Sequence, residues 1–282
     1  MTEIIKTDQP IVDTKQFHLS TRGDAGMVLN GDYKSQIVFS IPDAVVADDS
    51  IDFIYFSIPY AVIPNSFYVI NETNNQLYVL QSSVTTLYTF PLGNYTTQSF
   101  INTFKTLLPS TFNITLGQNS NRFTITHTTT TFSLTSASTI DSIMGFTGTV
   151  AATGLTLTLP RVCNFLPEPR ICIRCADLAN SLMTATNNSS DVILAVPNTS
   201  RLNGQIIYTN NSNMKTLFKL TNLNQFYVSL TNDDGVPINF NGVSSFFTFQ
   251  FDIHRKTLAK PMPFDKLVNF VNSQSLLEPM NN

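Results

Sequence analysis

The chain has 282 residues and a mass of 31.3 kDa, enough for one large all-β domain or two small domains. Charged residues make up only 12% of it, about half the usual share in a soluble protein, so the polar surface must consist largely of Asn, Thr, Ser and Gln. Such a surface fits a chain mostly covered by copies of itself, or an extracellular adhesin. The net charge of −3, with no basic arm or Arg-rich run, argues against direct nucleic-acid binding.

Residues 1–16 are polar and charged, and we expect them to form a flexible N-terminal arm. They have neither the apolar core nor the cleavage pattern of a signal peptide. Elsewhere no run approaches the roughly 18 apolar residues that a membrane-spanning helix needs, so no transmembrane segment is expected. We therefore expect the protein to be made and folded in the cytosol.

From residue 36 onward, runs of β-branched and aromatic residues alternate with clusters of Pro, Asn, Asp or Gly, a pattern that predicts strand after strand. Residues 58–80 are the most informative, because they read as strand, corner, strand, turn and strand. The predicted strands are 36–41, 51–58, 66–70, 76–80, 84–90, 112–116, 122–126, 131–135, 170–176, 191–196, 205–208, 217–221, 226–231 and 245–254. This spacing is typical of a β-sandwich or barrel.

A helix is predicted over residues 96–108, where Phe100 and Phe104 belong to one apolar stripe. Asn94 or Thr96 can cap its start and Pro109 ends it. We expect this helix to close one open end of the sandwich.

Two shorter signals mark turns. Residues 138–141 resemble a capping box, with Gly145 placed to end one or two helical turns. Residues 232–235, with the sequence Asn-Asp-Asp-Gly, predict a hairpin turn because these residue types tolerate positive φ.

Residues that could carry chemistry are few and scattered. The three histidines, His18, His127 and His254, fall in the arm and in two predicted strands, and no catalytic motif surrounds them. The acidic pairs at 48–49 and 233–234 lie in turn contexts. We therefore expect no catalytic residue, no cofactor and no metal site, and a chain that is not an enzyme.

Cys172 and Cys175 have the CxxC spacing, but neither a second such pair nor a nearby His completes a zinc set. Alternation of Ile171 and Ile173 with Cys172 and Arg174 predicts a strand that places the two cysteines on opposite faces. Two packed thiols are the favoured interpretation.

The last segment, residues 260–282, begins with strand-breaking prolines and is expected to form a C-terminal arm with a short amphipathic helix. Its apolar residues must dock either on the chain's own domain or on a neighbour, and both options stay open. The candidate inter-subunit contact residues are Phe264, Leu267, Val268, Phe270 and Val271. Between the arms, residues 17–259 are expected to form the β domain, with a division near 150–160 left open.

Certain residues of this β framework go beyond the generic pattern. They are Ile41-Pro42-Asp43, the run 63–71 (IPNSFYVIN), Asn74-Asn75, Gly93-Asn94-Tyr95-Thr96, the run 121–125 (NRFTI), Ser138-Thr139 and Met144-Gly145-Phe146. In these the chain resembles jelly-roll capsid proteins of eukaryotic double-stranded DNA viruses, and most of all those of the virophage, polinton-like and giant-virus group. The resemblance covers residues 37–146, and its motifs are architectural.

The resemblance implies an all-β jelly-roll sandwich with one or two short helices and an additional β region, inserted or appended. It implies a structural subunit of an icosahedral capsid, located in the virion and made in the host cytoplasm. The length favours a penton (vertex) or minor capsid protein, which would assemble with itself, as a pentamer in preference to a trimer, and with neighbouring capsid proteins. Two alternatives remain: a compact double jelly-roll major capsid protein, and a receptor-binding or lectin-like head using Tyr60, Tyr68 or Tyr95.

Overall fold

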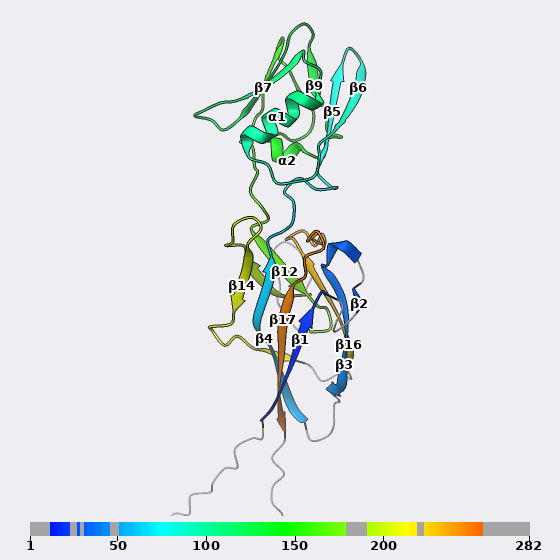
Figure 1. Cartoon of the computed structure of the whole chain (residues 1–282), viewed down its shortest axis with the longest axis vertical. Helices are drawn as coiled ribbons and strands as arrows, with labels where there is room; N and C mark the ends of the chain where they lie inside the picture. Colours follow the sequence, from blue (N-terminus) through cyan, green and yellow to red (C-terminus); the bar gives the residue numbers. More distant parts are fainter. Residues whose placement is uncertain are drawn as a thin grey trace, which may run out of the picture.

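The computed structural model describes residues 12–22, 27–28, 31–45, 51–178, 191–218 and 223–255. The chain forms two units, one above the other along the long axis in Figure 1, and each has its own hydrophobic core. We call the lower unit the roll. The upper unit, residues 69–165, is called the insert, because it lies between two strands of the roll. Among the described residues no helix has the length and apolar character needed to span a membrane.

The roll consists of two antiparallel sheets. Sheet A has the order β1 (Val12–Ser20), β17 (Phe246–Arg255), β4 (Ile51–Pro64) and β14 (Gln205–Thr209), and β15 (Thr216–Phe218) also pairs with β4. Sheet B has the order β13 (Val192–Pro197), β12 (Arg170–Arg174), β16 (Leu223–Thr231), β3 (Gln36–Val45) and β2 (Met27–Val28), with a short 3-10 helix at Gly31–Tyr33 before β3.

The strand order identifies the fold. When the eight main strands are numbered along the chain, sheet A reads first, eighth, third, sixth, and sheet B reads second, seventh, fourth, fifth. This is the order of a jelly roll, in which two Greek keys fold over one core. The predicted fold class is confirmed, and the additional β region is inserted between the third and fourth main strands.

The core of the roll lies between the two sheets and is rich in phenylalanine. Alternate residues of β17 point inward, so Phe249 and Phe251 are fully buried. Phe251 stacks on Phe226 of the opposite sheet, with ring centroids 5.7 Å apart, and its ring lies 5.3 Å from that of Phe56. Such aromatic pairs add to the large apolar area that each ring removes from water.

Strand β4 runs through the position where a corner was predicted. Tyr60 pairs with Thr248 and Ser57 with Gln250, so two residues of β4, Ile58 and Pro59, face the single residue Phe249. This is a β-bulge, one of the few places where a sheet interior accepts proline, which has no N–H to donate. The proline carbonyl still accepts a bond from the Asn210 N–H at 2.9 Å.

The insert contains two further antiparallel sheets and two helices. One sheet has the order β10 (Val150–Ala151), β9 (Phe132–Leu134), β5 (Gln76–Gln81) and β6 (Val84–Thr89), and the other β11 (Thr156–Thr158), β8 (Phe123–His127) and β7 (Phe112–Leu116). The helices are α1 (Thr97–Leu107) and α2 (Asp141–Met144). This is not the jelly-roll order, so within the described ranges the chain has one roll, and the compact double roll is not the architecture found.

Helix α1 lies within one residue of its predicted bounds at each end, but it covers a different core. The Thr96 side chain accepts from the Ser99 N–H, and the Ser99 hydroxyl accepts from the Thr96 N–H, which together form a capping box. Phe100 stacks on Phe90 with centroids 4.9 Å apart and lies 5.4 Å from Phe123. The prediction that this helix closes the sandwich was wrong, because its apolar face is buried inside the insert.

Part of the expected N-terminal arm, residues 12–16, is strand, because β1 begins at Val12 and pairs with β17 along its whole length, and residues 1–11 lie outside the described residues. Leu19 is buried against the core of the roll, whereas Thr14 and Gln16 face outward. Strand alternation with polar outward residues made this segment look like an arm.

Two local predictions also fail. Residues 66–70 form no strand, and only Ile70 makes a bridge, with Gly93. No capping box starts α2, because the hydroxyl groups of Ser138 and Thr139 instead accept from the backbone of β5, at 3.0 and 3.1 Å. Gly145 does end α2, with a φ of 93° that favours glycine.

The chain changes unit at different places from the division left open at 150–160. Leu157 and Leu159 belong to the core of the insert, and Phe165 packs against it. Phe67 belongs to the core of the roll and Ile70 to that of the insert. The proposed contact residues at 264, 267, 268, 270 and 271 lie outside the described residues.

Candidate assembly surfaces

The outward face of sheet A carries an apolar row near the insert. Val62 lies directly opposite Phe246 on one side and opposite Ile207 on the other, so these three side chains share one face. Phe246 is 46% exposed and Ile207 58% exposed. A solvated face of an antiparallel sheet normally carries polar residues. The apolar row of Phe246, Val62 and Ile207 is therefore an exposed patch that crosses three strands.

A groove of about 430 Å³ adjoins the apolar row. Its lining includes Val62, Pro64, Phe246, Val243 and Arg22. Tyr60, 42% exposed, continues the same face between Thr248 and Thr209. Row, groove and tyrosine form a surface suited to contact with another protein.

Further down the same face, polar groups satisfy one another. Asp252 is almost fully buried and accepts from Thr14 at 2.8 Å, from Lys215 at 2.7 Å and from Gln250 at 3.0 Å. Burial by itself would raise the pKa of Asp252, but the bonds from Lys215, Thr14 and Gln250 outweigh it and hold that pKa below its usual value. The charges on this part of the face are thus paired within the chain.

Two chain segments, residues 65–68 and 166–169, connect the units, and we call them the neck (Figure 1). Asn198, in the loop after β13, ties both segments to the roll. Its amide oxygen accepts from Asn65 at 3.4 Å, its amide nitrogen donates to the Glu168 carbonyl at 3.0 Å, and its own N–H donates to the Pro169 carbonyl at 2.8 Å. One residue, through its side chain and its backbone N–H, therefore fixes the spacing of the two crossings.

Further contacts hold the first crossing on the roll. The Ser66 hydroxyl donates to the Phe240 carbonyl at 2.6 Å, and the rings of Phe67 and Phe240 meet edge to face with centroids 6.1 Å apart. Across the junction, the Asn239 amide lies 3.4 Å from a carboxylate oxygen of Glu72, a residue of the insert. The neck is thus held by specific contacts on its roll side.

A cleft of about 580 Å³ lies at the neck and is lined by both units. Its lining includes three carboxylates, Glu72, Glu168 and Asp234, and neither Lys nor Arg among the described residues. Burial raises the pKa of Glu168. A hydrogen bond with Asn232 works against this shift, whereas the nearby charges of Asp233 and Asp234 add to it. The cleft is therefore an acidic surface.

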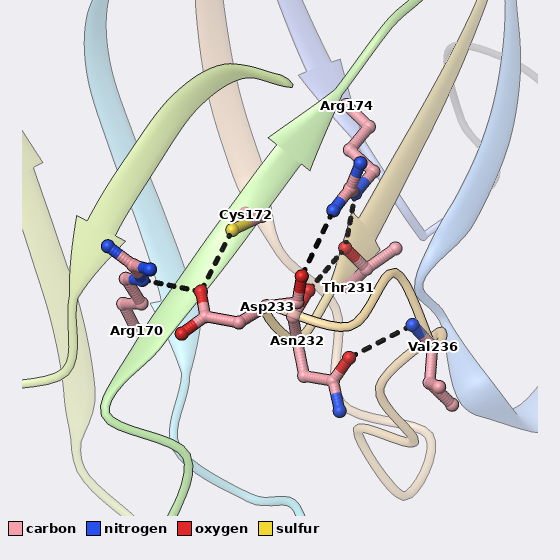
Figure 2. Close-up of polar contacts among 7 residues, drawn as sticks. All are labelled: Arg170, Cys172, Arg174, Thr231, Asn232, Asp233 and Val236. Carbon is pink, nitrogen blue, oxygen red and sulfur yellow. Dashed lines mark hydrogen bonds and ion pairs between the residues drawn. The ribbon is translucent and has the colours of Figure 1, made fainter. Parts of the chain in front are cut away.

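The predicted turn at 232–235 is confirmed. One of its acidic residues, Asp233, binds side chains of the strand β12 in sheet B. Figure 2 shows Asp233 accepting from both Arg170 and Cys172 of β12, the latter at 3.5 Å. Arg174 donates to the Thr231 hydroxyl at 2.8 Å and reaches the Asp233 carbonyl at 3.5 Å. Gly235, with φ of 83°, closes the turn. These contacts join strands rather than prepare a reacting group.

The two cysteines of the CxxC spacing do face opposite sides of β12. Cys175 belongs to the core of the roll with Ile171 and Ile173, whereas Cys172 lies beside Asp233 on the other side. Burial raises the pKa of Cys175 to about 12. Burial also raises the pKa of Cys172, as does the neighbouring Asp233. Both thiols are free, and at neutral pH they stay protonated.

The structure does not bring the three histidines together. His18 bonds to Thr248, His254 stacks on Phe53, and His127 is buried in the insert beside Thr130. Within the described ranges, no group of three or more His, Cys, Asp or Glu residues is arranged to hold a metal ion. The three candidate tyrosines are also apart: Tyr60 lies on sheet A, Tyr68 lines the neck cleft, and Tyr95 packs on Phe100.

Sequence reasoning missed the apolar row and the asparagines of the neck. Before the bulge at Pro59 the odd-numbered residues 55 and 57 of β4 point outward. After the bulge the even-numbered residues 60 and 62 do, so a regular alternation across the whole strand does not predict the row. The Asn65–Asn198 contact joins residues 133 positions apart. The one available signal was an Asn within an otherwise apolar run.

No protein-family model and no curated protein sequence matches the chain. Among solved structures, the mavirus penton protein matches over 86% of this chain and 100% of that one, with 14% identity and a TM-score of 0.42. A chain of the Sputnik virophage matches over 85% of this chain and 98% of that one, with 11% identity and a TM-score of 0.42. The second structure is that of a virophage, a group that the sequence resemblance also names. At this TM-score neither decides a function, which rests on the chain's own geometry.

Proposed function

We propose that the chain is a structural subunit of an icosahedral viral capsid, located in the virion as the penton or as a minor capsid protein. It acts as a homo-oligomer, a pentamer in preference to a trimer, in contact with neighbouring capsid proteins. The observation that carries this proposal is the apolar row on the outward face of sheet A, in register across three strands of a jelly roll.

Assembly gives the apolar row a physical purpose. Burying apolar surface contributes about 25 cal/mol per Å², and fully covering one large side chain contributes about 1.5–3 kcal/mol. Further along the same face the charge of Asp252 is already paired with that of Lys215 within the chain, so covering this pair leaves neither charge uncompensated. Such a face can be buried between copies at low cost.

We also propose that the chain works without catalysis. Two of its carboxylates, Asp233 and Asp252, are held in ion pairs with Arg170 and Lys215. Segment 260–282 acts as a tie between subunits through Phe264, Leu267, Val268, Phe270 and Val271. The native mass of the chain with and without residues 260–282 tests this tie. A smaller oligomer without the segment indicates docking on a neighbour, and an unchanged oligomer indicates docking on its own copy.

The test is the sedimentation of the double variant Phe246→Ser and Ile207→Ser at micromolar concentration. We expect it to fold and to lose the oligomer, because both side chains are exposed in the single chain. The matched control is Leu155→Ser, at a residue 41% exposed in a turn of the insert, and it should assemble normally. An unchanged oligomer in the double variant would refute the role of the row.

The neck cleft favours a second function, binding of a neutral carbohydrate by a receptor-binding head. Tyr68 lines the cleft together with the amide side chains of Asn71, Asn74 and Asn164, and aromatic rings with amides are a setting that accepts hydroxyl-rich ligands. A glycan array would show binding that Tyr68→Ala removes. If no glycan on the array binds, the carbohydrate-binding function is refuted and assembly is the one proposed function that remains.

A further inference from the structure

Strand β6 is an edge strand that extends beyond its own core. It pairs with β5 through six consecutive residue pairs, joined by a two-residue turn at Ser82 and Ser83 with φ of 48° and 63°. Thr86 lies opposite the buried Val79, yet Thr86 itself is exposed. Of the six residues of β6 only Tyr88 is partly covered. The described part of the chain therefore leaves both faces of β6 in water.

The backbone of β6 also offers free hydrogen-bonding groups. In a two-residue hairpin the pair next to the turn, here Gln81 and Val84, exchanges both bonds, and bonded pairs then recur at every second residue. The bond from the Phe90 N–H to the Asn75 carbonyl, 2.8 Å, continues this alternation. The N–H and C=O groups of Thr85, Leu87 and Thr89 thus point away from β5, where no described strand pairs with them.

β6 lacks the devices that keep exposed edges from pairing. The sequence contains no charged residue between Glu72 and Lys105, and β6 has neither a proline nor a register shift. Several other edges are protected: β1 carries Asp13 and Lys15, and β2, β10 and β11 have only two or three residues. An edge of this length without protection is suited to accept another strand.

We propose that β6 pairs with the free edge of β7 in a neighbouring copy of this chain, so that the inserts close into a ring above the rolls. β7 has five residues, long enough to match β6, and Figure 1 places the two strands on opposite flanks of the insert. Bonds from Gly117 to Arg122 and from Thr128 to Thr111 fix the alternation of the β7–β8 pair, so Ile114 and Leu116 point their backbone groups away from β8.

Charge and symmetry favour this partner. Residues 106–121, which include β7, are uncharged like β6, so the two edges meet without burying a charge. Each copy gives one edge and receives one, so a closed ring leaves no such edge exposed. Two strands of five or six residues bury less than the ~800 Å² per partner of a stable interface, so the contact adds to the one made by the roll. The inference thus rests on the proposed oligomer.

Hydrogen exchange of single amides is the first test. In the assembled protein the amides of Thr85, Leu87 and Thr89 should exchange at least about tenfold more slowly than in the unassembled Phe246→Ser/Ile207→Ser variant. The amides of Val84, Thr86 and Tyr88, bonded to β5, are the internal control and should change little. An oligomer in which the three outward amides exchange as fast as in the single chain overturns the β6 contact and leaves the capsid proposal standing. A chain that forms no oligomer overturns both.

Charge substitution then identifies the partner edge. Leu87→Glu and Thr115→Lys, both at exposed positions, should each weaken the oligomer about tenfold in its dissociation constant, whereas Leu155→Glu should not. The double variant Leu87→Glu/Thr115→Lys should recover, because in a parallel pairing Leu87 bonds to Ile114 and Leu116 and lies opposite Thr115, so opposite charges meet across the contact. A double variant as weak as Leu87→Glu alone, with normal thermal unfolding, overturns β7 as the partner. Leu87→Glu that assembles like Leu155→Glu overturns the β6 contact itself.

Discussion

The roll and the insert bury similar aromatic cores beneath different surfaces. The insert contains only five charged residues, Glu72, Lys105, Arg122, Asp141 and Arg161, and its surface consists mainly of Thr, Asn and Ser. The roll instead uses ion pairs such as Asp252–Lys215 and Arg174–Asp191. In the roll, charged side chains pair with one another, and an apolar row is exposed on the outward face of sheet A. In the insert, charged side chains are nearly absent, and the exposed feature is the edge of strand β6. Both surfaces suit burial against neighbours.

The largest expected effects come from core substitutions that separate the two units. Phe251→Ala in the roll and Phe100→Ala in the insert each remove a fully buried ring and should cost about 3–5 kcal/mol. Because the cores are separate, each change should lower the hydrogen-exchange protection mainly in its own unit. Equal loss of protection in both units after either substitution would show that they unfold as one.

A smaller effect is expected at the neck. Asn198→Ala removes the side-chain bonds to Asn65 and Glu168 and should cost about 1–3 kcal/mol, with faster exchange of the Asn203 N–H, which bonds to the Asn65 carbonyl. The control is Asn210→Ala, which loses two side-chain bonds, both to Met214 in a loop of the roll, whereas Asn198→Ala also loses two bonds from Ser200. Asn210→Ala should leave the neck amides unchanged. If both variants change the exchange rate of the Asn203 N–H equally, Asn198 does not hold the two neck segments together.

The smallest effects come from pH, and they have opposite signs in the two places. The folded pKa of Asp252 is lowered, so its contribution is present above the ordinary Asp pKa of about 4 and is lost as the pH falls through the folded value. Asp252→Asn should therefore flatten the loss of stability of the roll in acid. Urea unfolding at several pH values measures this, and an unchanged acid slope would contradict it.

Glu168 should behave in the opposite way. Its folded pKa is raised, mainly by burial, so its contribution is present below the ordinary Glu pKa and is lost as the pH rises through the folded value. In the unaltered chain the Asn198 N–H should therefore exchange faster as the pH rises, after correction for intrinsic rates. In Glu168→Gln this pH-dependent increase should be absent. If the corrected exchange rate of the Asn198 N–H in the unaltered chain does not change with pH, the predicted difference between neck and roll is wrong.

Strand positions could be predicted because alternation and turn residues are local properties. Residues 112–116 were predicted with the bounds that the structure has, and helix α1 differs by one residue at each end. β1 was missed because its outward residues are polar, and the proline at residue 59, in a run read as strand, corner and strand, lies in a bulge that depends on Phe249, far along the chain. The apolar row and the neck depend on such distant pairings, which a local pattern does not contain.

The mass of the full-length chain under native conditions tests the central claim most directly, that this jelly roll assembles with copies of itself. Native mass spectrometry at micromolar concentration should give five times the chain mass of 31.3 kDa. A trimer would contradict the vertex role and keep a capsid role. A species of 31.3 kDa at every concentration, with termini intact, would contradict the assembly account itself.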